Sequence, residues 1–199
     1  LNYACYQDAR FMLVATPAGI TLAPEGGAHQ SVSTPLIGLG QPGLTSFEPA
    51  FADEVAAIMA WGFRHMQADD GGSVYLRLST RAIAQPTRKS TAAFRNDVVA
   101  GAYWRVAPTK KTKAVIAYAG AIAPEATAAI EKLASQGTET ALLAITSVDR
   151  LYEDWRRDGL ASHIAKLLAD VPNKARLVSV LDGHPATLTW IAGVSGHPI

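Results

Sequence analysis

Cysteine and charge are both scarce in this sequence. There is a single cysteine, Cys5, among 199 residues. One cysteine can neither close an internal disulfide nor supply a zinc cage, so we expect a reducing, cytoplasmic compartment. Charged residues make up 18% of the chain and the formal net charge is +1. A near-neutral chain has no strong electrostatic attraction to nucleic acid, and no apolar run is long enough to span a membrane, so neither partner is expected.

The motifs that mark many self-contained enzymes are also absent. The sequence has no GxSxG elbow, no P-loop, no HExxH and no paired-cysteine motif. These absences argue against a complete hydrolase, a nucleoside triphosphatase or a zinc enzyme, and no metal site is expected within the chain. Leu1 falls inside a predicted helix, and the sequence stops where a new strand could begin. We therefore expect a fragment of a longer polypeptide.

Strand and helix patterns alternate along much of the chain. A buried parallel strand is expected at 9–17, an amphipathic helix at 49–67 and a strand at 72–80. Later segments follow the same alternation, with strands at 113–120, 139–147 and 175–183 and helices at 124–137, 148–170 and about 185–194. Strands that alternate with helices predict an α/β protein with two doubly wound, mainly parallel sheets.

Two segments lack a clear period. Residues 18–45 are rich in glycine, proline, serine and threonine, and so long a connection without secondary structure is uncommon unless it has a function. Residues 82–112 have mixed charge and no sustained period, and we place the domain boundary there. The predicted division is a first domain at 1–95, a linker at 96–112 and a second domain at 113–199.

Residues 24–31, PEGGAHQS, form the strongest candidate site. They follow a predicted strand, and ligand sites in open α/β sheets lie beyond the carboxyl ends of the strands. The imidazole of His29 can donate, accept or carry a proton near neutral pH, and Glu25 could orient it. The other members are two glycines, which let backbone approach a ligand, and two polar residues: Gly26, Gly27, Gln30 and Ser31. The alternative is an ordinary turn with a surface histidine.

Two further strand ends carry groups suited to anions. Arg81 follows the strand at 72–80, and its planar guanidinium could clamp a carboxylate or phosphate; a structural ion pair is the alternative. The stretch LDGHP at 181–185 joins a predicted strand to a helix. Such a junction can bind an anion at the helix N-terminus, or it can be a structural corner.

Three stretches together resemble one enzyme family. They are LVATPAGITLAPEGGAHQS, QPGLTSFEPAFADEVAAIMAWGF and YLRLSTR. They resemble the pyrimidine-binding domain of transketolase-like, thiamine-diphosphate-dependent enzymes, and most of all the single-chain decarboxylating component of bacterial pyruvate dehydrogenase complexes. The segment from AVIAYAG to LDGHPATLTW is similar to the C-terminal domain of the same family. The resemblance implies part of a pyrimidine-binding domain at 1–95 and a truncated C-terminal domain at 113–199.

The resemblance also implies a chemistry. Thiamine diphosphate with Mg²⁺ would be the cofactor and the electron sink for decarboxylation of a 2-oxoacid such as pyruvate. The acyl unit would pass to a lipoyl group on an acyltransferase component. By similarity, His29 would be catalytic and donate a hydrogen bond or proton to developing oxyanion charge, with Glu25 in support. Residues on the substrate side would be Gln30, Ser31 and Arg81.

The resemblance leaves parts of the site outside the chain. The family's glutamate that activates the aminopyrimidine, the aromatic residues that stack on it, and the domain for diphosphate and Mg²⁺ have no counterpart here. The main cofactor-binding residues are therefore unknown, and we expect a homodimer or a partner chain to complete the site, with the chain inactive alone. Transketolases have aspartate where Gly26 stands, which favours a 2-oxoacid. Two-carbon transfer of the transketolase type, or a non-catalytic α/β module that dimerises or binds an anion, are the alternatives.

Overall fold

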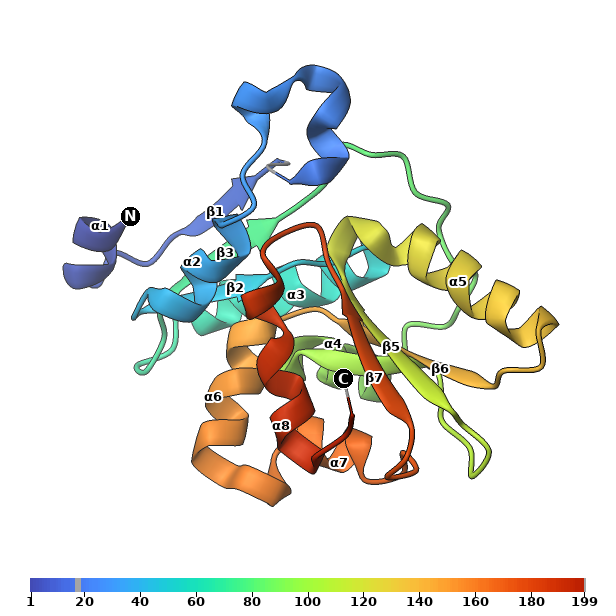
Figure 1. Cartoon of the computed structure of the whole chain (residues 1–199). Helices are drawn as coiled ribbons and strands as arrows, with labels where there is room; N and C mark the ends of the chain where they lie inside the picture. The colour runs from blue at the N-terminus through green and yellow to red at the C-terminus, as the bar shows by residue number, and fades with distance from the viewer. Residues whose placement is uncertain (17–18, 199) are drawn as a thin grey trace.

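The structure is a computed structural model that describes residues 1–16 and 19–198, with Ile20 and His29 described without their side chains. Two β-sheets lie side by side with helices packed on them (Figure 1). Among the described helices, none has the length and apolar character needed to cross a membrane. The predicted α/β fold class is confirmed.

The first sheet has three parallel strands. They are β1 (Met12–Ala15), β2 (Leu44–Phe47) and β3 (Ser73–Arg77), in the order β1-β3-β2. The central strand β3 is buried along its whole length. The strand expected at 9–17 is parallel as predicted, but it is not buried: Leu13 is 39% exposed and Val14 is 50% exposed. β1 is an edge strand, which accounts for this exposure.

Helix α3 (Ala52–His65) occupies the core of the region predicted as a helix at 49–67. Its first turn carries Asp53 and Glu54, whose charge complements the positive end of the helix dipole. The Glu54 carboxylate also accepts hydrogen bonds from the backbone N–H groups of Ala50 and Phe51, at 2.7 and 3.1 Å. These bonds satisfy donors that the helix itself leaves free, so the helix begins at a defined residue.

The connection expected to be unstructured at 18–45 contains four short elements. They are the 3₁₀ turns η1 (Ile20–Glu25) and η2 (Gly27–His29), helix α2 (Thr34–Gly40) and the start of β2. A further helix, α1 (Asn2–Tyr6), precedes β1. α2 packs against β2, so this connection follows the edge of the first sheet.

The second sheet has four strands in the order β4-β6-β5-β7. β5 (Ala114–Ala119), β6 (Thr140–Ile145) and β7 (Arg176–Val180) are parallel, and β4 (Ala102–Val106) runs antiparallel to β6. The helices between the strands are α5 (Ala123–Ser135), α6 (Val148–Asp158) and α7 (His163–Leu168), and α8 (Ala192–Ser195) follows β7. Short 3₁₀ turns complete the order: η3 (Gly120–Ile122), η4 (Gly159–Ala161), η5 (Pro185–Thr187) and η6 (Thr189–Ile191).

The segment expected to be a linker at 96–112 is regular structure over much of its length. It contains the end of α4 (Ala92–Ala100) and all of β4. Gly101, with φ +116°, makes the turn between them. A register shift between Trp104 and Val106 interrupts the pairing of β4 with β6. A bulge of this kind breaks the two-residue alternation by which a strand is recognised. The division into domains at these bounds stays a prediction.

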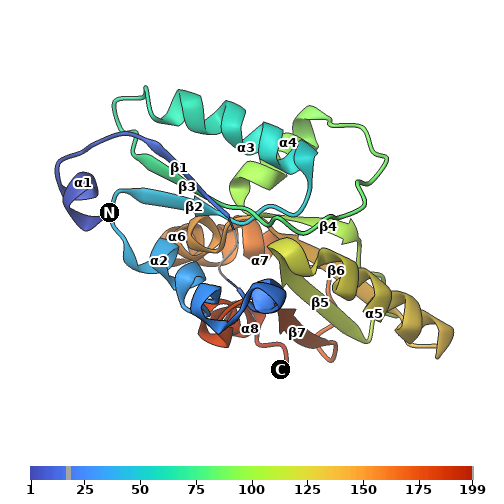
Figure 2. The same ribbon diagram turned by 90° about the horizontal axis from the view of Figure 1, so that it is seen from above.

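The two sheets share one interface. The backbone N–H of Glu48, just after β2, donates to the carbonyl of Thr146, just after β6, at 2.8 Å. The Ser147 hydroxyl donates to the carbonyl of Ser46 at 2.6 Å, and the Asp149 carboxylate accepts from the Ser46 N–H at 2.8 Å. One buried apolar cluster contains residues of both sheets. Figure 2 shows α3 and α4 together on one side of the strands.

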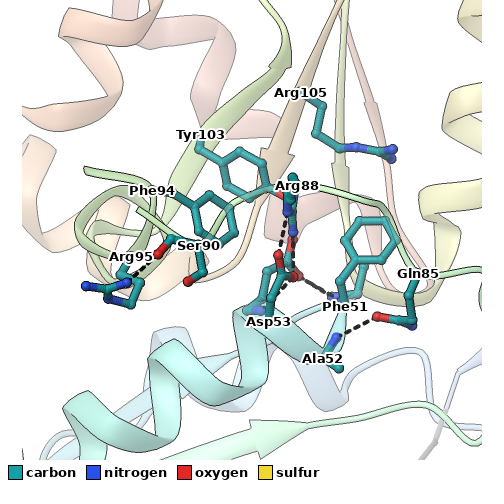
Figure 3. A network of polar contacts seen from close by, with 12 residues as sticks. Phe51, Ala52, Asp53, Gln85, Arg88, Ser90, Phe94, Arg95, Tyr103 and Arg105 are labelled. Atoms are coloured by element: carbon teal, nitrogen blue, oxygen red, sulfur yellow. Dashed lines mark hydrogen bonds and ion pairs between the residues drawn. The ribbon is translucent and has the colours of Figure 1, made fainter. Parts of the chain in front are cut away.

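A second connection between the sheets is centred on Arg88 (Figure 3). Its guanidinium donates two hydrogen bonds to Asp53 of α3, at 2.5 and 2.7 Å, and one to the Tyr103 hydroxyl of β4, at 2.6 Å. The Tyr103 hydroxyl in turn donates to the buried carboxylate of Glu54. The Phe94 ring lies under Arg88, with 4.3 Å between the guanidinium carbon and the ring centroid. Burial raises the pKa of Glu54, against the opposing effect of these hydrogen bonds.

We expect Arg88→Met to lower the free energy of unfolding by about 2–4 kcal/mol, because it leaves the buried Glu54 carboxylate and the half-buried Asp53 carboxylate without a cation. Urea unfolding followed by tryptophan fluorescence measures the change. Arg95→Met is the matched control, since Arg95 is exposed and donates only to the carbonyl of Ser90. That variant should change stability by less than about 0.5 kcal/mol. Equal stability of the two variants would contradict a linking role for Arg88.

Candidate functional site

The predicted site lies in a loop at the carboxyl end of β1. Residues 21–32 are called the site loop below. Within it, η1 ends at Glu25, which is exposed, and Gly26 follows with φ +99°. The backbone of His29 ends η2, but its side chain lies outside the described part of the chain. Gln30 and Ser31 are half-buried, and the Ser31 hydroxyl oxygen accepts a hydrogen bond from the Thr34 hydroxyl at 2.7 Å.

Both ends of the site loop contact the turn that follows β7. At its start, the backbone N–H and the hydroxyl of Thr21 donate to the two carboxylate oxygens of Asp182, at 3.1 and 2.5 Å. At its end, the carbonyl of Val32 accepts from the backbone N–H of His184 at 2.6 Å. The LDGHP stretch therefore lies beside the predicted site, where it acts as the structural corner that was one of its two interpretations.

A buried charge cluster lies next to this contact. Arg77, at the end of β3, pairs with the Glu48 carboxylate through one guanidinium nitrogen and donates to the Asp182 carbonyl at 2.8 Å through the other. The Asp182 carboxylate is 3.7 Å from the same nitrogen. Arg77 is 6% exposed and Asp182 is 2% exposed. Burial raises the pKa of Glu48 to about 7, which the positive charge of Arg77 offsets only in part.

Sequence patterns did not single out Glu48, and they marked Asp182 only as a member of the LDGHP stretch, with no role of its own. A signal for them exists, because each carboxylate comes within two residues of the end of a strand, Glu48 after β2 and Asp182 after β7. The carboxyl ends of parallel strands meet at one edge of a sheet. The sequence pattern does not show that the ends of strands from two different sheets meet at a single arginine.

Arg81 contacts a different element. Its guanidinium donates to the carbonyl of Ala121 at 3.2 Å and pairs with Glu125 at 2.5 Å, at the start of α5. This is the structural ion pair that was the alternative for Arg81. Among the hydrogen bonds and ion pairs of the described residues, none joins Arg81 to residues 25–31. Arg81 also lines an open pocket of about 510 Å³ together with Arg105 and Phe51, so a substrate role for Arg81 stays a prediction.

The described residues contain no cluster of side chains of the usual metal-ligating types. No group of three or more histidine, cysteine, aspartate or glutamate side chains comes together as a metal site in that part of the chain. The site loop by itself offers an accessible carboxylate and polar groups at a strand end, which suits substrate binding and proton transfer.

Two curated relatives are similar to much of this chain. The chain is 33% identical over 164 residues to the pyruvate dehydrogenase E1 component of Mycolicibacterium smegmatis, covering 79% of this chain and 17% of that protein. It is 30% identical over 170 residues to the pyruvate dehydrogenase E1 component of Mycobacterium tuberculosis, covering 82% of this chain and 18% of that protein. The chain thus spans less than a fifth of the length of these relatives. No protein-family model matches it.

The fold is shared with solved transketolases. The transketolase from Leishmania mexicana matches with a TM-score of 0.73 at 20% identity, over 95% of this chain and 25% of that chain. A transketolase variant from Pichia stipitis matches with a TM-score of 0.70 at 21% identity, over 90% of this chain and 24% of that chain. At this level of identity the likeness concerns the fold alone.

The raised pKa of Glu48 predicts a pH dependence of stability. A carboxyl group whose pKa rises from 4.5 to about 7 on folding stabilises the fold while it is protonated. This contribution is complete below pH 4.5 and is lost as the pH rises through 7. We expect the unfolding free energy of the wild type, relative to Glu48→Gln, to fall by up to about 3 kcal/mol over that range.

Urea unfolding of both proteins at several pH values between 4.5 and 8 measures this difference. Glu125→Gln is the control, because the hydrogen bond from Arg81 lowers the pKa of Glu125. Its contribution is present above the ordinary glutamate pKa and is lost only as the pH falls further, so no change is expected between pH 5 and 8. If the unfolding free energy of the wild type relative to Glu48→Gln rises with pH instead, the ion pair with Arg77 outweighs burial.

Proposed function

The resemblance to the transketolase-like family of thiamine-diphosphate enzymes is confirmed in both sequence and fold, and from it we propose that this chain forms part of a 2-oxoacid dehydrogenase of the pyruvate dehydrogenase E1 type. The observation that carries the proposal is the 33% identity over 164 residues to such a component. The proposed reaction is decarboxylation of a 2-oxoacid, with pyruvate as the first candidate, and transfer of the acyl unit to a lipoyl group.

In this proposal the site loop faces the substrate. His29 donates a hydrogen bond or proton to the oxygen on which negative charge develops, and Glu25 supports it. Gln30 and Ser31 contribute polar groups from the same loop. The accessibility of Glu25 and the fixed ends of the loop support this assignment.

The remaining parts of the active site are proposed to come from another segment or from a partner chain. Thiamine diphosphate, when bound, supplies the electron sink for loss of carbon dioxide. Since the resemblance places the family's domain for diphosphate and Mg²⁺ outside this chain, no step is assigned to cofactor groups within it. We propose a homodimer or a partner chain that completes the site, a lipoyl-bearing acyltransferase as the acceptor, and a cytoplasmic location.

Transketolase-type two-carbon transfer is the second candidate. It is favoured by the shared fold, with a TM-score of 0.73 to a transketolase. The 30–33% identity to E1 components favours the oxoacid reaction, as does glycine at position 26, where transketolases have aspartate. The two reactions differ in the acceptor, so assays with a lipoyl acceptor and with an aldose phosphate distinguish them.

A measurement of cofactor binding distinguishes the two candidate enzymes, the 2-oxoacid dehydrogenase and the transketolase, from a non-catalytic module. We expect the assembly that contains this chain to bind thiamine diphosphate with Mg²⁺ in isothermal titration calorimetry, because the family's chemistry requires it. The 199-residue chain alone should give no binding heat, because the resemblance places the family's diphosphate and Mg²⁺ domain outside this chain. An assembly that folds and binds no thiamine diphosphate would instead indicate an α/β module without this chemistry.

His29→Ala should lower 2-oxoacid decarboxylation in the assembled enzyme by about 100-fold or more, because general acid and electrostatic assistance is lost. Initial rates with pyruvate and an artificial electron acceptor measure the effect. His65→Ala is the matched control. The ring of His65 stacks on Trp61 and accepts a hydrogen bond from Gly72, just before β3 begins, at the opposite end of that strand from the site. If both variants keep the wild-type rate, the assignment of His29 is wrong.

A further inference from the structure

The site loop begins and ends against three consecutive residues of the turn after β7 of the second sheet, Asp182 to His184, called the clasp below. Thr21 contacts Asp182 through two hydrogen bonds, and Val32 contacts the backbone N–H of His184. Because residues 182 and 184 are close in the chain, the two ends of the loop are brought together. A compact surface loop with closed ends is an Ω-loop, a type of segment that often carries function.

Asp182 is the residue of the clasp whose side chain makes the contact. Each of its carboxylate oxygens accepts one hydrogen bond from Thr21, at 3.1 and 2.5 Å. Arg77 approaches from within the protein, with a nitrogen 3.7 Å from the carboxylate and 2.8 Å from the Asp182 carbonyl. The carboxylate is buried at 2% exposure. Hydrogen bonds to a buried charged group are among the strong ones, so Asp182 fixes the start of the loop firmly.

Glycine is required at two positions of this contact, one just before the site loop and one within the clasp. A Cβ atom at Gly19 would lie 2.0 Å from a carboxylate oxygen of Asp182, and one at Gly183 would lie 2.6 Å from the ring of Pro35. Separations this short are not possible between unbonded heavy atoms, so a side chain at Gly19 would displace the Asp182 carboxylate from Thr21, and one at Gly183 would displace the clasp from Pro35 of α2. The close approach of the two segments therefore depends on the absence of a side chain at these positions.

We propose that Asp182 is a positioning residue for the reaction, acting from the second sheet through Thr21 on the loop that carries His29. The inference rests on the proposed function for its catalytic consequence. Ordering a free loop costs conformational entropy at each turnover, and a small displacement of a catalytic group can lower the rate about 100-fold. Asp182 itself touches neither substrate nor cofactor in this role. It is expected to affect kcat more than KM, since it orders the loop rather than binding the substrate.

Three variants test the proposal in the full assembly that contains this chain. Asp182→Ala removes both acceptors, and kcat for 2-oxoacid decarboxylation should fall about 100-fold while KM changes by less than about threefold. Asp182→Asn keeps an acceptor for the Thr21 N–H and a polar partner for its hydroxyl, and should retain most of kcat. Gly19→Ala leaves the carboxylate intact and displaces it sterically, so it should resemble Asp182→Ala.

Amide hydrogen exchange of residues 21–32 in the same assembly provides a readout that does not depend on activity. Exchange there should rise about tenfold or more in Asp182→Ala and Gly19→Ala, and stay near wild type in Asp182→Asn. Exchange in α5 should be unchanged in all three, which shows that the fold is intact. Asp170→Ala is the control for an exposed aspartate, and it should leave both exchange and kcat unchanged.

The outcomes separate this inference from the proposed function. If the wild-type assembly shows no 2-oxoacid activity, the proposed function fails, while exchange of residues 21–32 still tests the clasp. Unchanged exchange in Asp182→Ala would overturn the inference, and so would increased exchange with an unchanged kcat in an active enzyme. Should Asp182→Ala fail to fold, Gly19→Ala and the recovery in Asp182→Asn decide the question.

Discussion

The pairing of one buried arginine with two carboxylates is the interaction on which both the fold and the candidate site depend. Arg77 comes from the central strand of the first sheet, Glu48 from the turn after β2, and Asp182 from the turn after β7 of the second sheet. A buried charge is tolerated only when its partners are in place. The cluster therefore requires the two sheets to meet in one arrangement, and in that arrangement Asp182 also reaches Thr21 of the site loop.

In this arrangement the two sheets contribute differently to the candidate site. The first sheet carries the proposed catalytic loop at the carboxyl end of β1, and the second contributes none of the proposed catalytic residues. The turn after β7 of the second sheet supplies the contacts that hold the site loop. Tyr103 of the second sheet also connects the two sheets through Arg88. In the proposed E1-type enzyme, the second sheet would then be needed for an ordered active site as well as for a stable fold.

Much of the secondary structure could be predicted because its signals are local. The helices α3 and α5 and the strands β3, β5, β6 and β7 lie within the segments that their apolar periods indicated. β4 was missed because its bulge at Trp104 to Val106 interrupts the alternation, and α4 was missed because its apolar stripe is weak beside those of the longer helices. The burial of β1 was predicted wrongly, since a sequence does not show that a strand lies at the edge of a sheet.

The sequence by itself determined the fold class, the family resemblance and the loop that carries His29, because periodicity, turn residues and short motifs involve residues that are neighbours in the chain. Only the tertiary structure decided which distant groups meet. It paired Arg81 with Glu125 of α5 and joined Thr21 to Asp182, 161 positions further along the chain. Such contacts depend on how two sheets pack against each other, and the packing is set by the whole buried surface and its charges, which no local pattern contains.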